Sequence, residues 1–432
     1  MNTSTATPSA GCLRWRRRNP GRAWATMATV ACVHGHLCAG WMATATAQAV
    51  VQDPFELEVR TAAIDDLAPE PTARLAPVTV TQAQVAQMSP AVEAALELRS
   101  TTLQQLDAAG AVQTLKVALR LNGERRTLDL YPYSMRSDDF VLLVQDESGD
   151  LYEDAPPPIT TYRGHVVGDL QSDVAASIIE GKLYATIVTQ GDAWAVQPVG
   201  GAADGAPDNL HAVYRQADVI PAGGQCGVPD TALPRVDPQG GRHGGAADTQ
   251  GTGGRTQIAF DTDVEYYQLN GSSITLTVAD IEMIMTQVGL VYQAQSNICY
   301  VEERIIVRTA GPDPYSLTNS SNLLCQFRNF WNNNITTSRD IAHLMTGKNL
   351  DGTTIGVAWV GVVCNESGFS GTIANCSNTA NLGYGLSQTR FSANVVARSA
   401  LTAHELGHNW NSCHCNQNTC TGGNADADCG IM

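Results

Sequence analysis

Two histidines four residues apart, followed by a third, constrain this chain more than any other feature. The stretch reads His404-Glu405-Leu406-Gly407-His408-Asn409-Trp410-Asn411-Ser412-Cys413-His414. Residues four apart lie on one face of a helix, so His404 and His408 can share one metal ion. Neutral imidazole suits Zn²⁺, and three protein ligands leave a fourth position for water. Glu405 is placed to take the proton that such a water loses.

The third histidine can join the other two only if the helix ends before it. A continuous helix turns about 100° per residue, which would aim His414 away from His404. Asn411 stands where the break is needed, and asparagine tolerates the left-handed conformation best after glycine. The sequence therefore predicts His404, His408 and His414 as ligands of one catalytic Zn²⁺ ion, with Glu405 as the general base.

These residues resemble the extended zinc signature of the metzincin endopeptidases, HExxHxxGxxH, with Asn411 in place of the usual glycine. The ADAMTS branch of the adamalysin/reprolysin family carries the same asparagine. Cys429-Gly430-Ile431-Met432 looks like the methionine turn of these enzymes. The resemblance implies an α/β, zincin-like catalytic domain in residues 255–432, with a twisted, mostly parallel sheet and an active-site helix. It also admits a structural Ca²⁺ ion.

The resemblance carries one departure at the end of the chain. Family members continue past the methionine turn with a segment that walls the S1′ pocket and then a helix. We therefore expect the catalytic domain to be incomplete at its C-terminus, which leaves the activity of this truncated form open.

The first 47 residues read as a signal peptide. A basic segment is followed by a mildly apolar stretch at 23–42 and by the small residues Ala45-Thr46-Ala47. An N-terminal membrane anchor is the alternative, but His34, Gly35 and His36 make a poor bilayer span. The net charge of −16 argues against a nucleic-acid partner. We expect a secreted, extracellular protein without a membrane span.

Cysteine usage agrees with export. Three of the twelve cysteines lie in the predicted signal peptide. Eight more fall in the C-terminal region and suit four disulfides in an oxidising compartment: Cys299, Cys325, Cys364, Cys376, Cys413, Cys415, Cys420 and Cys429. A second zinc cluster is the alternative for the last four. Cys226 is left without a partner.

Residues 48–230 read mostly as β-strands. Apolar residues alternate at Leu115, Val117, Leu119 and Leu121, and Asn122-Gly123 predicts a tight hairpin turn. The run from 162 to 169 resembles a stretch of the propeptide of reprolysin-type proteases. We therefore expect a β-rich propeptide domain here, in which His165 is structural because no second ligand stands at a suitable spacing.

A second informative stretch is Gly224-Gln225-Cys226-Gly227-Val228-Pro229-Asp230. It resembles the cysteine switch of the matrixin propeptide, Cys-Gly-Val-Pro-Asp, in which a thiolate takes the water position on zinc. The resemblance implies Cys226 as a zinc ligand in the latent form only. A turn with an unpaired or intermolecular cysteine is the alternative. The glycine-rich residues 231–254 read as a linker where processing would fall.

From residue 255 the pattern alternates between strand and helix. We expect a helix capped by Thr277, a second helix over 323–331 and a buried strand over 354–363. Residues 383–389 suggest an exposed edge strand that a peptide could extend. His343 reads as a structural histidine, since three better metal ligands exist.

Together these features predict the precursor of a secreted zinc metalloendopeptidase that cuts protein or peptide substrates and is inhibited by its own propeptide. A non-catalytic, zinc-stabilised binding or adhesion module is one alternative, and a metzincin of another family is a second. Glu405 separates the first alternative from the prediction, because a structural zinc site has no use for a general base.

Overall fold

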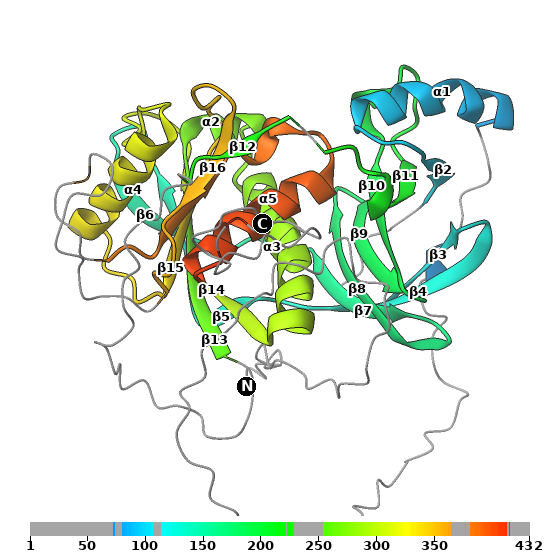
Figure 1. The fold of residues 1–432 in the computed structure, drawn as a ribbon, viewed down its shortest axis with the longest axis horizontal. Helices are drawn as coiled ribbons and strands as arrows, with labels where there is room; N and C mark the ends of the chain where they lie inside the picture. The colour runs from blue at the N-terminus through cyan, green and yellow to red at the C-terminus, as the bar shows by residue number, and fades with distance from the viewer. Residues whose placement is uncertain are drawn as a thin grey trace, which may run out of the picture.

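The computed structural model describes residues 72–73, 80–106, 114–221, 223–228, 254–363, 376, 381–412 and 414. Within them the chain forms two β-sheets with a long helix between them (Figure 1). The predicted signal peptide, residues 231–253 of the predicted linker and the predicted methionine turn at 429–432 lie outside the described residues.

The first sheet comes wholly from residues before the linker. Its strand order is β1-β3-β4-β7-β8-β9-β10-β11-β2, and all pairs except β1 with β3 are antiparallel. The strands are β1 Thr72–Ala73, β2 Thr102–Gln105, β3 Leu115–Leu121, β4 Glu124–Pro132, β7 Thr161–Val166, β8 Asp169–Ile179, β9 Lys182–Thr189, β10 Asp192–Pro198 and β11 Leu210–Arg215.

The predicted hairpin of this sheet is confirmed. Positive φ angles of 52° at Asn122 and 80° at Gly123 turn β3 back onto β4. This pair of left-handed residues matches the twist of the flanking strands, which is why Asn-Gly is favoured there. Leu115, Val117 and Leu119 point into the core, as their alternation predicts.

The second sheet is mixed and mostly parallel, with the order β12-β16-β17-β15-β13-β14-β5-β6. Antiparallel pairing occurs between β16 and β17 and between β5 and β6. The strands are β5 Arg136–Gln145, β6 Leu151–Asp154, β12 Gln225–Cys226, β13 Gly254–Thr262, β14 Ile298–Arg308, β15 Ile341–Met345, β16 Thr354–Ala358 and β17 Tyr384–Ser387. Because β5, β6 and β12 precede the linker, this sheet takes strands from both sides of it.

Five α-helices and three short 3₁₀-helices complete the described part of the chain. They are α1 Gln82–Ala95, α2 Val264–Leu269, α3 Ile274–Ser296, α4 Ser320–Asn334, α5 Val395–Asn409, η2 Gly200–Ala202, η3 Gln216–Asp218 and η4 Thr389–Phe391. The helix expected over 323–331 is therefore observed as the longer α4. Its N-cap is Asn319, whose side chain accepts a hydrogen bond from the Asn322 backbone.

Helix α3 begins one turn earlier than the sequence suggested. Its N-cap is Ser273, which accepts from the backbone N–H of Leu276, so the assignment of Thr277 as the cap is wrong. Thr277 lies inside the helix and its hydroxyl donates to the Ser273 carbonyl at 2.8 Å. Ser273 fits the N-cap role equally well, and local pattern alone did not choose between the two residues.

Helix α3 is buried on nearly all sides because it lies between the two sheets. Ile281 and Val288 face the core of the second sheet, while Leu290 packs with Ala175 and Val188 of the first. Among the described helices, α3 is long and apolar enough to cross a membrane, yet 83% of its apolar window is buried inside the protein. Its hydrophobicity is explained by this position in the core.

Candidate metal centre

Helix α5 positions the first two histidines. Its N-cap Asn394 accepts hydrogen bonds from the backbone of Val396 and Ala397, which fixes where the helix begins. His404 and His408 follow one turn apart on the same face, and their Nε2 atoms lie 3.0 Å from each other. The helical spacing therefore converges two imidazoles on one point, as predicted.

The chain reverses at Asn411, as the sequence analysis also predicted. Asn411 has a φ of 71°, in the left-handed region. Its N–H donates to the His408 carbonyl at 2.8 Å, and the N–H of Ser412 donates to the Gly407 carbonyl at 2.9 Å. This pair of bonds is a Schellman motif, in which a left-handed residue terminates the helix. The reversal brings His414 back, with its Nε2 at 3.3 Å from that of His404.

Cys226 reaches the same point from the other side of the linker. Strand β12 adds to the edge strand β16 in parallel orientation, through Gln225 N–H to the Thr353 carbonyl at 2.8 Å and Gly227 N–H to the Gly356 carbonyl at 2.7 Å (Figure 1). This pairing aims the Cys226 sulfur at His408 Nε2, 3.3 Å away. The structure thus brings together all four residues that the sequence singled out as metal ligands.

The four donor atoms fit one zinc ion. Sγ of Cys226 and one ring nitrogen of each histidine all lie within 4.8 Å of one another. Ligands on a tetrahedral zinc ion, at about 2.0–2.1 Å for nitrogen and about 2.3 Å for sulfur, stand roughly 3.3–3.6 Å apart. Three of the six separations are 3.0 to 3.3 Å, close to that range, and the others do not exceed 4.8 Å.

The tautomer of His408 also suits a metal. Its Nδ1 lies 2.7 Å from the Ser412 carbonyl oxygen, which can only accept a hydrogen bond. Nδ1 therefore carries the proton, and Nε2 presents its lone pair to the cluster. Burial and the neighbouring His404 lower the pKa of His408, which keeps the ring neutral.

Glu405 lies beside the cluster in a fully buried position. Its Oε2 is 3.6 Å from the Cys226 sulfur, and its Oε1 has no hydrogen-bond partner among the described residues. Burial raises the pKa of Glu405 to about 8, and burial also raises the pKa of the Cys226 thiol. Both groups therefore favour their protonated forms unless a nearby cation stabilises the charged ones.

Gly356 makes room for Glu405 and was missed by the sequence analysis. A Cβ atom at position 356 would lie 2.5 Å from Glu405 Oε1, so any larger residue would collide with this carboxylate. A glycine inside an apolar strand is a general sign of close approach. That sign does not say which group approaches, and only the fold supplies Glu405.

The exposed edge strand expected at 383–389 is a wrong assignment. Strand β17 covers Tyr384–Ser387, lies between β16 and β15 and is fully buried. The strand next to the metal centre at the sheet edge is β16, and β12 covers it in this structure. The segments at 354–363 and 383–389 are both apolar, so the sequence did not determine which of the two strands lies nearer the edge of the sheet.

The histidines expected to be structural lie outside the cluster. His343 is fully buried on β15, with its Nε2 2.9 Å from the Ser387 hydroxyl. His165 lies on β7 in the first sheet, opposite Asp129. Neither residue is among the four that gather around the candidate metal position.

The cysteine predictions are tested in part. Cys325 and Cys376 form a disulfide, and Cys299 is also disulfide-bonded. Cys226 is a free thiol, in agreement with its expected lack of a disulfide partner. The remaining cysteines of the C-terminal region, including those considered for a second zinc cluster, lie outside the described residues.

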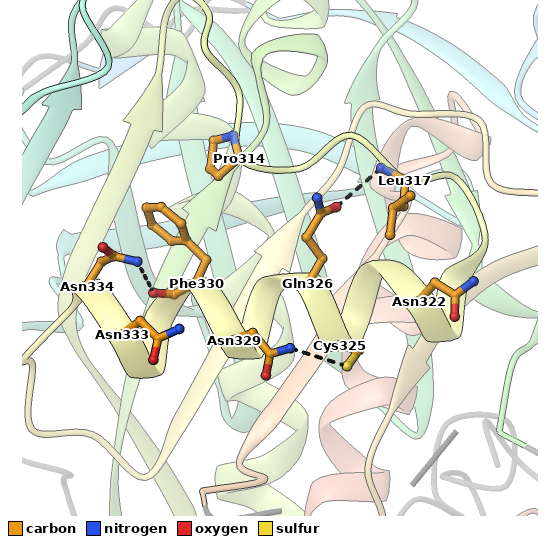
Figure 2. A pocket seen from close by; sticks show the side chains of 9 residues that line it. All are labelled: Pro314, Leu317, Asn322, Cys325, Gln326, Asn329, Phe330, Asn333 and Asn334. Atoms are coloured by element: carbon orange, nitrogen blue, oxygen red, sulfur yellow. Dashed lines mark hydrogen bonds between the residues drawn. The ribbon is translucent and has the colours of Figure 1, made fainter. Parts of the chain in front are cut away.

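A separate hollow of about 520 Å³ lies over helix α4 (Figure 2). Its wall is rich in amide side chains, several of which bond to nearby groups, as in the bond from Asn334 Nδ2 to the Phe330 carbonyl at 2.7 Å. Cys325 in this wall is held in its disulfide. None of the four clustered ligands lines this hollow, so it is distinct from the metal centre.

Comparison with known proteins finds one matching family model and a similar solved structure. Residues 254–431 match the family model of the metallo-peptidase family M12. Among solved structures, metalloproteinase-II from Bacteroides fragilis is similar, with 13% sequence identity, a TM-score of 0.35, and coverage of 73% of this chain and 83% of that chain. The family match supports a metallopeptidase, and M12 metallopeptidases use zinc.

Proposed function

We propose that this chain is the precursor of a secreted zinc metalloendopeptidase of the adamalysin/reprolysin type, with its propeptide before residue 231. The observation that carries the proposal is the convergence of three imidazoles and one thiol beside a buried glutamate. A zinc ion held by His404, His408 and His414 would polarise both water and the scissile carbonyl.

Glu405 has the position of a general base. Its carboxylate lies beside the place that Cys226 occupies, which is where water would stand once the thiol leaves. Glu405 takes the proton of the attacking water and later passes it to the leaving amine. A peptide substrate would pair along the edge of β16 that β12 now covers.

Cys226 explains latency in this proposal. Its sulfur completes the ligand set and therefore excludes water from the fourth position. Cleavage within residues 231–253 would free the short β12 segment to leave. Secretion through the N-terminal 47 residues agrees with the disulfide between Cys325 and Cys376, since such bonds persist in oxidising compartments.

A non-catalytic zinc module is the second candidate, and Glu405 argues against it. A purely structural zinc site gains nothing from an unpaired carboxylate buried next to its ligands, and burial without a partner is costly. Glu405 Oε1 is buried in this way. The cost is understandable if the carboxylate serves catalysis.

The test is the substitution Glu405→Ala in the chain cleaved at the linker. We expect peptide hydrolysis to fall roughly 10²–10⁴-fold, as for the loss of a general base. Zinc content, measured by atomic absorption, should stay at one ion per chain. Glu147→Ala, an exposed glutamate in a turn, is the matched control and should leave both values unchanged. Full turnover by the Glu405→Ala protein would reject the mechanism.

A further inference from the structure

Strand β5 joins the second sheet although it precedes the linker. It pairs in parallel with β14 and carries β6 on its other side. We infer that the N-terminal region, residues 80–228, remains bound as a second chain after linker cleavage, because β5 is a permanent strand of the sheet that bears the metal centre. Activation then requires only that the segment around Cys226 leave the metal centre. This part of the inference rests on the function proposed above.

The apolar side chains of β5 are part of the main core. Leu142 and Val144 are 0% and 1% exposed and pack in one cluster with Ile305, Val307 and Phe260 of the neighbouring strands. The backbone N–H of Glu302 also donates to the Met135 carbonyl at 2.7 Å. Loss of β5 would expose this core and leave the edge of β14 unpaired.

Arg136 on β5 supplies the positive charge for the buried carboxylate of Glu282. Its Nε lies 2.5 Å from Glu282 Oε1, and both side chains of this ion pair are almost fully buried. Glu302 pairs in register with Arg136 and is 0% exposed, its carboxylate oxygens have no hydrogen-bond partner among the described residues, and burial raises its pKa well above the usual value. Departure of Arg136 would leave the Glu282 carboxylate buried without its counter-charge, which is strongly unfavourable.

Gln145 at the end of β5 completes a second buried network. Its Oε1 accepts from Arg308 Nη1 at 2.5 Å, and its Nε2 donates to the Ala310 carbonyl at 2.6 Å. Arg308 in turn forms a buried ion pair with Asp261 on β13, at 2.7 Å. Without Gln145, a buried guanidinium N–H and a carbonyl would lose their partner.

The first sheet also holds the start of helix α5. Gln197 on β10 donates from Nε2 to the Ala393 carbonyl and accepts from the Val395 N–H, both at 3.0 Å. The N-cap Asn394 is fully buried and donates to the Leu96 carbonyl at 2.8 Å. The N-terminal region therefore supports the same helix that presents His404 and His408.

Apart from the Cys226 ligand itself, the segment at Cys226 pairs with the sheet over a much shorter length than β5 does. Strand β12 has two residues, Gln225 is exposed, and the strand lies at the outer edge of the sheet. Backbone hydrogen bonds from Gln225 and Gly227 join it to β16 and the residue before it, and the neighbouring Val228 is its buried apolar contact. This contrast predicts that a cut in the linker frees β12 while β5 stays in place.

The experiment uses the full chain with Glu405→Ala and with a recognition site for a sequence-specific protease inside residues 231–253. After cleavage, we expect both fragments to elute together from a size-exclusion column, at the volume of the uncut chain. Separate elution of the two fragments under native conditions would overturn the inference. Because Glu405→Ala removes the proposed base, the result does not depend on peptidase activity, so this inference and the proposed function can fail separately.

Matched arginine variants then locate the contact. In the cleaved protein with Arg136→Ala, the two fragments should dissociate from each other roughly 100-fold faster, as expected for breaking a buried ion pair. With Arg125→Ala, at an exposed position of β4, the two fragments should dissociate at the wild-type rate. Equal rates for both variants would reject β5 as the anchor. If Arg136→Ala fails to fold before cleavage, Gln145→Ala provides the same comparison with a smaller effect.

Discussion

The chain reversal at Asn411 decides whether the third histidine can reach the other two. The residue adopts a φ of 71°, and its backbone ends helix α5 through the bond to His408. A Cβ atom at Gly361 would lie 2.9 Å from Asn411 Oδ1, so the amide is also packed against this loop. The position demands a residue that tolerates the left-handed conformation and is small enough to fit against Gly361.

Substitution of Asn411 should therefore change zinc affinity according to backbone preference. Asn411→Gly should bind zinc as tightly as the wild type, because glycine adopts positive φ freely. Asn411→Val should bind at least about 10-fold more weakly, since a left-handed conformation costs a non-glycine residue about 1–2 kcal/mol and a branched side chain more. Competition with a chromophoric chelator measures both affinities.

Asn297→Val is the control for general loss of stability. Asn297 is also left-handed, with a φ of 55°, but it caps the distant end of α3. This variant should lose stability and keep its zinc affinity. Equal zinc affinity in the glycine and valine variants at position 411 would contradict the explanation.

Single residues of the centre were largely predictable from sequence. The spacing of His404, His408 and His414 indicated three donors, and the resemblance of the Cys226 segment to a cysteine switch indicated the fourth. Gly356 was not predictable, because its role is to leave space for Glu405 from another element. Spacing along one helix is a local property, whereas contact between a strand and a helix depends on the fold.

At the scale of elements, β15 contains a histidine that burial keeps neutral. His343 is fully buried between neighbouring strands, and burial lowers its pKa to about 3. In the unfolded chain its pKa is about 6.5. Below pH 6.5 the unfolded state therefore binds more protons than the folded state. The stability contributed by His343 is complete above pH 6.5 and is lost as the pH falls toward 3.

Urea unfolding at pH 7 and pH 5 tests this contribution. Wild type should lose about 2 kcal/mol more stability than His343→Gln between these two pH values. His165→Gln, at a half-buried position of the first sheet, should follow the wild type. The same loss in His343→Gln and wild type would show that His343 does not couple folding to pH.

Elements were predictable where the pattern is local. The alternation before Asn122-Gly123 gave the β3–β4 hairpin, whereas the start of α3 and the exposure of β17 were assigned wrongly. The pairing of β5 with β14 could not be inferred, because it joins segments from opposite sides of the linker. Parallel pairing over such a distance leaves no signal in either strand alone.

At the scale of the whole molecule, the N-terminal region does more than place Cys226 at the candidate metal centre. It contributes strands to both ends of the sheet that bears the candidate metal centre, β12 at one edge and the pair β5–β6 at the other. The long-range contacts are unequal, since the second half of β5 enters the core and β12 is short and peripheral. The proposed inhibition and the inferred structural support would therefore reside in different parts of the same region.

The central claim is that Cys226 and the three histidines hold one zinc ion in the uncleaved chain. The zinc X-ray absorption spectrum of the uncleaved, zinc-loaded protein tests it most directly. We predict one sulfur at about 2.3 Å and three nitrogens at about 2.0–2.1 Å. The sulfur signal should disappear in Cys226→Ser. A first shell of nitrogen and oxygen alone in the uncleaved wild-type protein would contradict the claim.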